Sequence, residues 1–269
     1  MKNVLGSTWR ILAFVLTFAV LAAPLPRLAP SQFVIEAATL PLVAFVAFLF
    51  GRKLPRSVSS PSRAMAEWGV GIALGLGWIG VTLAGLFVGG VAQVTTQRPE
   101  LSTVAMLSVM TLVNAASQEV LFRGYPFALV SARHGTFAAI GVSTALFVLL
   151  HLGAAVGAPL AFVNLTFAGL LFGFARAVTG RLWLPIGIHF AWNVIIGPVL
   201  GLTVSGSQAL NAGASAVTLE GSDLFTGASF GVEASLATTI TTAILVVLLA
   251  RRQRSEPREP IAAPSPQTA

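Results

Sequence analysis

Several ionisable and amide side chains lie inside long apolar runs of this sequence. They are Glu119, Arg123, His151, His189 and Asn193. A charged group near the middle of a bilayer costs about 3 kcal/mol on insertion scales, so residues of this kind usually mark a functional site. A buried carboxylate can act as a base near neutral pH. The sequence therefore predicts a polar, chemically competent site inside an apolar protein.

Part of this set also fits a metal site. Glu119, His151 and His189 would supply three ligands and leave a position for water, as a catalytic zinc ion requires. However, the sequence contains no HExxH pair, and asparagine is a poor zinc ligand. No cofactor is assigned, and a single divalent metal such as zinc stays an open alternative.

The spacing of these residues places them at a similar depth. Glu119 and His151 are equally far along the chain from Gly135, where two apolar runs turn. At about 1.5 Å per residue, both lie about 20–24 Å from that turn if the runs are helical. Asn193 lies about 20 Å beyond a second turn near Gly180 by the same rule. These side chains are therefore expected to meet in one cavity between the fourth, fifth and seventh runs.

The composition identifies the kind of protein that holds them. Of 269 residues, 55% are hydrophobic and 9% are charged, whereas a soluble domain has about 25% charged residues. The chain has no cysteine, which excludes disulfides, thiolate metal sites and a cysteine nucleophile. We therefore predict an integral membrane protein.

Eight apolar runs are long enough to cross a bilayer core about 30 Å thick as helices. They span residues 10–26, 33–51, 68–93, 102–121, 136–154, 157–178, 182–203 and 234–250. None of them alternates as a membrane barrel strand does. The prediction is an all-α, polytopic membrane helix bundle with about eight transmembrane helices.

The cations predict how the bundle is oriented. If the amino terminus is cytoplasmic, the outer connections hold only Arg27 and Arg98, and the inner segments hold the remaining Lys and Arg except Arg123, which lies within the fourth run. This positive-inside bias predicts a multi-pass protein of the cell membrane with both termini cytoplasmic. The net charge of +7 is then explained by orientation and by contact with anionic membrane lipids, and no nucleic-acid partner is expected.

Small and amide residues predict close helix packing. Glycines spaced four apart let helix backbones approach each other, and Asn114 and Asn164 are expected to be packing amides. The glycine pairs are Gly71 with Gly75, Gly85 with Gly89, Gly169 with Gly173, and Gly197 with Gly201.

Three segments carry a family resemblance. QEVLFR at 118–123, FVLLH at 147–151 and HFAWN at 189–193 resemble the EExxxR, FxxxH and HxxxN motifs of the CAAX-protease and bacteriocin-processing family, including its type II CAAX prenyl proteases. The resemblance covers roughly residues 100–205. It implies a polytopic intramembrane endopeptidase of the metallo- or glutamate type.

The resemblance also implies a role for each residue. By motif position, His151 would orient or help deprotonate a water molecule, while His189 and Asn193 would stabilise the oxyanion. Glu119 and Arg123 would correspond to the second glutamate and the arginine of the first motif. Buried donors aimed at developing negative charge are most effective in a dry cavity.

The sequence departs from the family pattern at Gln118. Family members usually have a glutamate there, and that glutamate is the one assigned to water activation. A neutral amide can position water but cannot accept its proton. Glu119 is not an automatic substitute, because neighbouring helix positions point about 100° apart. The alternative function is therefore a catalytically lapsed member that acts as a membrane binding or chaperoning protein.

Each motif residue also has a structural interpretation. Glu119 and Arg123 can form an intrahelical ion pair, and Arg123 alone can extend to the membrane interface. His151 can donate to a backbone carbonyl, and His189 with Asn193 can clasp neighbouring helices. Because all of them fall in three ordered motifs, one shared site is the favoured interpretation.

Four regions follow from these observations. We assign 1–99 to N-terminal transmembrane helices, 100–205 to the catalytic core, 206–250 to a loosely ordered extracytoplasmic loop with the last transmembrane helix, and 251–269 to a disordered cytoplasmic tail. The predicted function is hydrolysis of peptide bonds in membrane-associated peptides or proteins. A transporter with buried relay residues is a weaker alternative.

Overall fold

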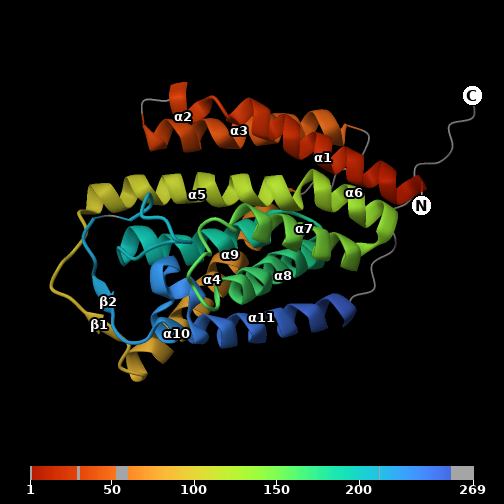
Figure 1. Cartoon of the computed structure of the whole chain (residues 1–269). Coiled ribbons are helices and arrows are strands. Elements are labelled where there is room, and N and C mark those ends of the chain that lie inside the picture. The colour runs from red at the N-terminus through yellow and green to blue at the C-terminus, as the bar shows by residue number, and fades with distance from the viewer. Residues whose placement is uncertain (1, 29–30, 53–59, 212, 256–269) are drawn as a thin grey trace, which may run out of the picture.

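The computed structural model describes residues 2–28, 31–52, 60–211 and 213–255, most of them helical (Figure 1). The helices are α1 (Lys2–Ala22), α2 (Leu25–Leu28), α3 (Gln32–Gly51), α4 (Pro61–Val88), α5 (Leu101–Arg123), α6 (Tyr125–His134), α7 (Thr136–Leu150), α8 (Ala161–Thr179), α9 (Trp183–Val194), α10 (Asp223–Thr226) and α11 (Leu236–Ser255). A π-helical turn, η1 (Ile195–Val199), continues α9, and the 3-10 turns η2 (Ala228–Phe230) and η3 (Val232–Ala234) precede α11. Strand β1 (Ala92–Val94) pairs antiparallel with β2 (Val217–Leu219), with Ala92 opposite Leu219.

The predicted fold class is confirmed, since each of the eight apolar runs forms a helix. Five helical stretches of the described chain are long and apolar enough to cross a membrane, and shorter apolar helices cover 37–51, 136–150 and 183–199. The boundaries of the third run were wrong. Instead of spanning 68–93, α4 begins at Pro61 and ends at Val88, where Gly89 and Gly90, the latter with φ +70°, end the helix.

The helix that carries the third motif lies at the centre of the bundle. Helices α1 and α3 run along one face of α5, while α9 and α4 lie on its other side (Figure 1). Helix α4 packs chiefly against α9, and both α7 and α11 pack against α8. Most side chains of α9 are buried, on every face, as expected of a core helix. Neighbouring parts of the bundle thus surround α9.

Two of the predicted glycine pairs do allow close helix contact. A Cβ on Gly75 would lie 2.7 Å from the carbonyl oxygen of Ile188 in α9, and one on Gly169 would lie 2.8 Å from the Thr144 methyl group in α7. By contrast, Gly85 has no heavy atom within 4 Å of such a Cβ. Gly197 meets Val204 and Leu210 instead of another helix. Close packing of α4 on α9 and of α8 on α7 therefore fixes the second and third motifs.

Sharp turns end the helices of the predicted hairpins. Gly135, with φ +83°, separates α6 from α7, and Gly180, with φ +71°, ends α8, as the sequence predicts. An additional break follows Arg123 at Gly124, where a Cβ would lie 2.2 Å from the carbonyl oxygen of Val120. Only glycine fits this bend, which divides the fourth run into α5 and α6.

The connection between α9 and α11 has defined secondary structure and is not the loosely ordered loop expected from its composition. It contributes β2 to the two-stranded sheet, together with α10 and two 3-10 turns. Glu233 in η3 accepts hydrogen bonds from Ser205, near the other end of this connection. Backbone and side-chain hydrogen bonds thus hold a Ser-, Gly- and Ala-rich segment in place.

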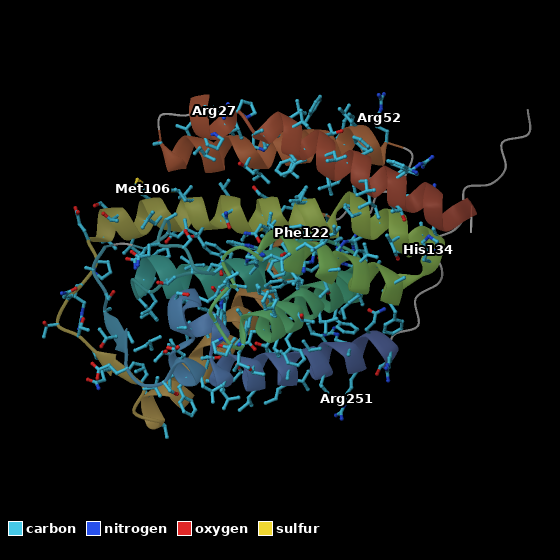
Figure 2. All side chains as sticks on the ribbon, viewed as in Figure 1. Arg27, Arg52, Met106, Phe122, His134 and Arg251 are labelled. Atoms are coloured by element: carbon cyan, nitrogen blue, oxygen red, sulfur yellow. The ribbon has the colours of Figure 1, made fainter. Side chains whose placement is uncertain are left out.

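Four basic residues lie toward the two ends of the bundle. Arg52, His134 and Arg251 lie toward the end where α1 begins, and Arg27 lies toward the opposite end (Figure 2). Helix α11 continues through Arg251 to Ser255, so the start of the predicted tail is helical. The remainder of that tail, 256–269, lies outside the described residues.

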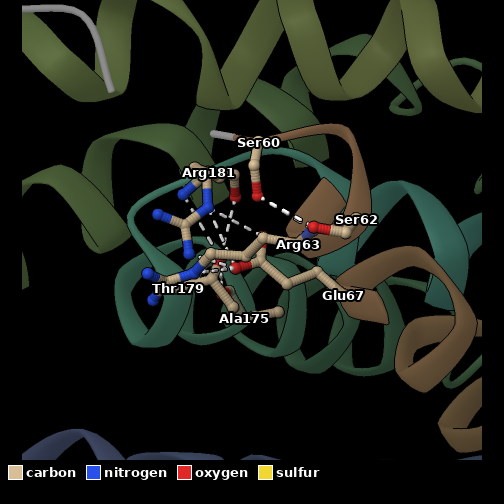
Figure 3. Close-up of polar contacts among 7 residues, drawn as sticks. All are labelled: Ser60, Ser62, Arg63, Glu67, Ala175, Thr179 and Arg181. Atoms are coloured by element: carbon tan, nitrogen blue, oxygen red, sulfur yellow. Dashed lines mark hydrogen bonds and ion pairs between the residues drawn. The ribbon is translucent and has the colours of Figure 1, made fainter. Parts of the chain in front are cut away.

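An ion pair joins the start of α4 to the turn between α8 and α9 (Figure 3). Arg181 Nε donates to both carboxylate oxygens of Glu67 at 2.9 Å, and Arg63 approaches the same carboxylate at 3.5 Å. Hydrogen bonding to Glu67 raises the pKa of Arg181. The contact anchors the beginning of α9, which carries His189 one or two turns further on.

Candidate active site

The first motif forms a fully buried ion pair on α5. Arg123 Nη1 lies 3.2 Å from Glu119 Oε1, and neither side chain is exposed to solvent. Complete burial is incompatible with Arg123 extending to the membrane interface, so that structural alternative is wrong. The intrahelical pair expected from the i and i+4 spacing is confirmed.

Aromatic rings and a backbone carbonyl surround the guanidinium of Arg123. Its Nη2 donates to Gly169 O in α8 at 3.1 Å. The centroids of the Phe147 and Phe172 rings lie 4.8 and 5.4 Å from its central carbon, within the range of a cation–π interaction. This arginine therefore connects α5, α7 and α8.

His189 joins the same ion pair from α9. Its Nδ1 lies 3.0 Å from Glu119 Oε1, and its ring stacks on Phe172 with centroids 4.7 Å apart. An ionised carboxylate can only accept, so Nδ1 carries the proton in this contact. The other ring nitrogen, Nε2, is left for a bound group. The predicted meeting of the first and third motifs is thus present.

His151 lies beyond the end of α7 and is linked to His189 through an aromatic ring. Its Nδ1 lies 2.8 Å from the carbonyl oxygen of Phe147, which is the backbone contact considered in the sequence analysis. The Phe147 ring lies 4.6 Å from the His151 ring and 6.2 Å from the His189 ring. Because a carbonyl only accepts, a neutral His151 presents an unprotonated Nε2.

Gln118 forms a hydrogen bond within its own helix. Its Nε2 donates to Asn114 Oδ1 at 2.9 Å. Its Oε1 is buried without a hydrogen-bond partner. The amide at this position is thus engaged with α5 and not with His151 or His189.

A small cavity lies beside His189. It has a volume of about 30 Å³ and is lined by His189 and Asn193 together with residues of α4, α7, α8, α11 and the α9–α11 connection. A water molecule needs about 10–15 Å³ of such volume, so there is room for one or two. The expected cavity between the fourth, fifth and seventh runs is wrong in two respects, because no α5 residue lines it and His151 does not line it either.

Glu233 is the cavity residue that the sequence analysis missed. Its Oε1 accepts from Trp192 Nε1 at 3.1 Å, and its Oε2 accepts from Ser205 Oγ at 2.9 Å and from Ser205 N. Burial raises its pKa, although the Ser205 and Trp192 hydrogen bonds and the nearby His189 oppose this shift. The available signal was an acidic residue directly before the last apolar run, which was assigned to the outer loop.

Asn164 holds Glu233 and the start of α11 against α8. Its Nδ2 donates to Glu233 O at 2.8 Å and to Ser235 O at 2.9 Å, and its Oδ1 accepts from Thr239 Oγ1 at 2.6 Å. All of its polar atoms are therefore engaged in packing. This confirms the prediction of a packing amide.

The suggested metal-ligand set does not fit a metal ion in this arrangement. Among the described residues, no group of three or more His, Asp or Glu side chains comes together as a metal site would require. Glu119 Oε1 is already shared by Arg123 and His189. We therefore assign no catalytic role to a metal ion at this site.

The fold and the site together define a polytopic helical membrane protein with a buried Glu–Arg–His cluster beside a polar cavity. Residues 100–195 match the family model described as type II CAAX prenyl endopeptidase Rce1-like. The match runs from the start of α5 into η1 and includes all three motifs, which confirms the predicted family. Searches of curated proteins and of solved structures found no match.

Proposed function

We propose that this protein is an intramembrane endopeptidase that hydrolyses peptide bonds in membrane-associated peptide or protein substrates. One observation carries the proposal: His189 and Asn193 line the same buried, water-sized cavity, and His189 is held by the Glu119–Arg123 pair. The match of residues 100–195 to a prenyl endopeptidase family supports the same reaction class.

The arrangement suits stabilisation of a tetrahedral intermediate. Asn193 supplies amide donors, and His189, which is held by Glu119 through Nδ1, presents its second ring nitrogen, Nε2. Preorganised donors stabilise a developing oxyanion strongly in a water-excluded site. Glu119 acts by orienting the His189 ring. His151 presents Nε2 toward incoming water or substrate beyond the Phe147 ring.

We also propose a location and an orientation for this protein in the membrane. The placement of the four basic residues toward the two ends of the bundle (Figure 2) supports a cell-membrane protein with both termini cytoplasmic and with anionic lipid around its cationic end. In that orientation the α9–α11 connection, which lines the cavity, faces away from the cytoplasm. Substrates are therefore segments within or attached to the bilayer, and nucleic acid is not a partner.

Cleavage of a defined peptide by the purified protein tests this function. In detergent, wild-type protein should cleave a prenylated or transmembrane test peptide, and His151→Ala should abolish cleavage. His134→Ala is the matched control, because His134 is exposed at the end of α6 and should cleave as wild type does. The function is wrong if wild type does not cleave, and the role of His151 is wrong if His151→Ala cleaves at the wild-type rate.

Gln118 supports a second candidate function. Its amide cannot accept a proton, and its Nε2 is engaged with Asn114, which is compatible with a lapsed enzyme that binds or chaperones membrane proteins. Cleavage by Gln118→Glu but not by wild type would favour this second function. Cleavage by wild type would exclude it.

A further inference from the structure

The cavity holds a carboxylate that the family motifs do not include. Glu233 lies in η3, outside the segment 100–195 that matches the family model. It lines the same cavity as His189 and Asn193. Position 118, where the family has its water-activating glutamate, holds an amide that is engaged elsewhere. The carboxylate available to water in this cavity is therefore the one on Glu233.

We propose that Glu233 is the general base of this protein and takes over the task that Gln118 cannot perform; this rests on the proposed peptidase function. The cavity has room for a water molecule beside Glu233. In the first step a water proton moves to a Glu233 carboxylate oxygen while the water oxygen bonds to the substrate carbonyl carbon. The electron pair of the carbonyl π bond moves to its oxygen, which His189 and Asn193 stabilise. In the second step the oxyanion pair re-forms the C=O bond, the C–N bond breaks with its electron pair leaving on nitrogen, and the proton on Glu233 passes to that nitrogen, which gives a carboxylic acid and an amine.

The surroundings of Glu233 suit such a proton exchange. Its donors, Trp192 and Ser205, carry no charge. The cavity-lining residues of α4, α7, α8 and α11 are apolar, amide or hydroxyl side chains, and α9 adds His189 as the titratable group that faces it. No lysine or arginine of the described chain lines the cavity, so a partly buried carboxylate there can release and regain a proton near neutral pH.

A purely structural role for Glu233 is the competing interpretation. Through Trp192 and Ser205 the carboxylate connects α9 to the beginning of the α9–α11 connection. If this were its whole function, its removal would lower stability and activity together. The test must therefore separate chemistry from folding.

The experiment measures kcat, KM and thermal stability in detergent, with the prenylated or transmembrane test peptide over a pH series. Glu233→Gln keeps the shape of the side chain but cannot accept the proton. We expect kcat to fall at least about 100-fold, with KM and unfolding temperature little changed. Glu220→Gln is the matched control, because this glutamate lies in the same connection but is exposed, and it should behave as wild type does.

The pH profile supplies a readout that a structural role would not move. Wild-type kcat/KM should rise with pH through an acid limb whose midpoint lies above the ordinary carboxyl range, and Glu233→Gln should lose that limb. Ser205→Ala removes a hydrogen bond that favours the charged carboxylate, so its limb should move to higher pH. Ser207→Ala, at an exposed neighbouring position, should leave the limb in place.

The outcomes distinguish the two proposals. If wild type cleaves and Glu233→Gln cleaves with the same kcat and the same acid limb, Glu233 is not the base while the peptidase function stands. A parallel loss of stability and activity in Glu233→Gln, with an unmoved limb in Ser205→Ala, likewise overturns the proposal. Absence of cleavage by wild type overturns both.

Discussion

His189 contacts the buried carboxylate of Glu119 and lines the same cavity as the partly buried carboxylate of Glu233, and the surroundings of the two carboxylates differ. On one side Glu119 pairs with the guanidinium of Arg123, which is enclosed by aromatic rings. On the other side Glu233 accepts hydrogen bonds from the uncharged donors Trp192 and Ser205 and faces the cavity. A fixed cation holds a carboxylate in its charged form, whereas neutral donors in a buried site let it exchange a proton. Glu119 is thus suited to orienting His189, whereas Glu233 is suited to proton transfer.

The largest effect on stability is expected on the Arg123 side. Arg123→Met should lower the free energy of unfolding by about 3–5 kcal/mol, because it leaves Glu119 as a buried charge without its cation. Arg63→Met is the control, since Arg63 is 65% exposed and 3.5 Å from Glu67, and should cost less than about 1 kcal/mol. Unfolding followed by circular dichroism in detergent measures both. Equal losses in the two variants would contradict the difference between the buried and exposed pairs.

A smaller loss of stability is expected where α4 packs closely against α9, the helix that carries His189. In Gly187→Ala the new Cβ would lie 2.5 Å from the carbonyl oxygen of Trp68, so the two helices must move apart at a cost of about 1–3 kcal/mol. Gly80→Ala adds the same methyl group to α4 where no heavy atom lies within 4 Å, and should be neutral or stabilising by up to about 1 kcal/mol. If Gly187→Ala is as stable as wild type, the close approach of α4 to α9 does not determine the position of α9.

The smallest effect concerns how stability depends on pH on the Glu233 side. Burial raises the pKa of Glu233 above its ordinary value of 4.5. At pH values between the ordinary pKa and the raised pKa of the folded protein, folded Glu233 keeps a proton that the unfolded chain has lost. The free energy of unfolding therefore falls as pH rises through this range. Glu233→Gln removes this contribution and should give a flatter curve in that range. The exposed control Glu220→Gln should follow the wild-type curve, and a Glu233→Gln curve parallel to wild type would contradict the raised pKa.

The sequence predicted the parts of this arrangement that depend on local spacing. Hydropathy located the helices, and counting from the turns at Gly135 and Gly180 placed Glu119, His151 and Asn193 at a similar depth. The side chain of α9 that contacts Glu119, at 3.0 Å, is His189, four residues before Asn193. The i and i+4 spacing also put His189 and Asn193 on one face, and both line the cavity.

The parts that local spacing could not predict depend on tertiary structure. No α5 residue lines the cavity, which depends on how α9 packs against its neighbours and not on the depth of its residues. Glu233 reaches Trp192 only because the α9–α11 connection folds back through its turns and β2. Hydropathy and motif spacing describe single helices, so they do not indicate a contact of this kind.

The most direct test of the account is the turnover of a membrane-associated test peptide by His189→Ala. Because His189 connects the oriented carboxylate to the cavity, its loss should lower kcat at least about 100-fold, while His134→Ala keeps the wild-type value. A His189→Ala protein that folds normally and cleaves as fast as the His134→Ala protein would contradict the account.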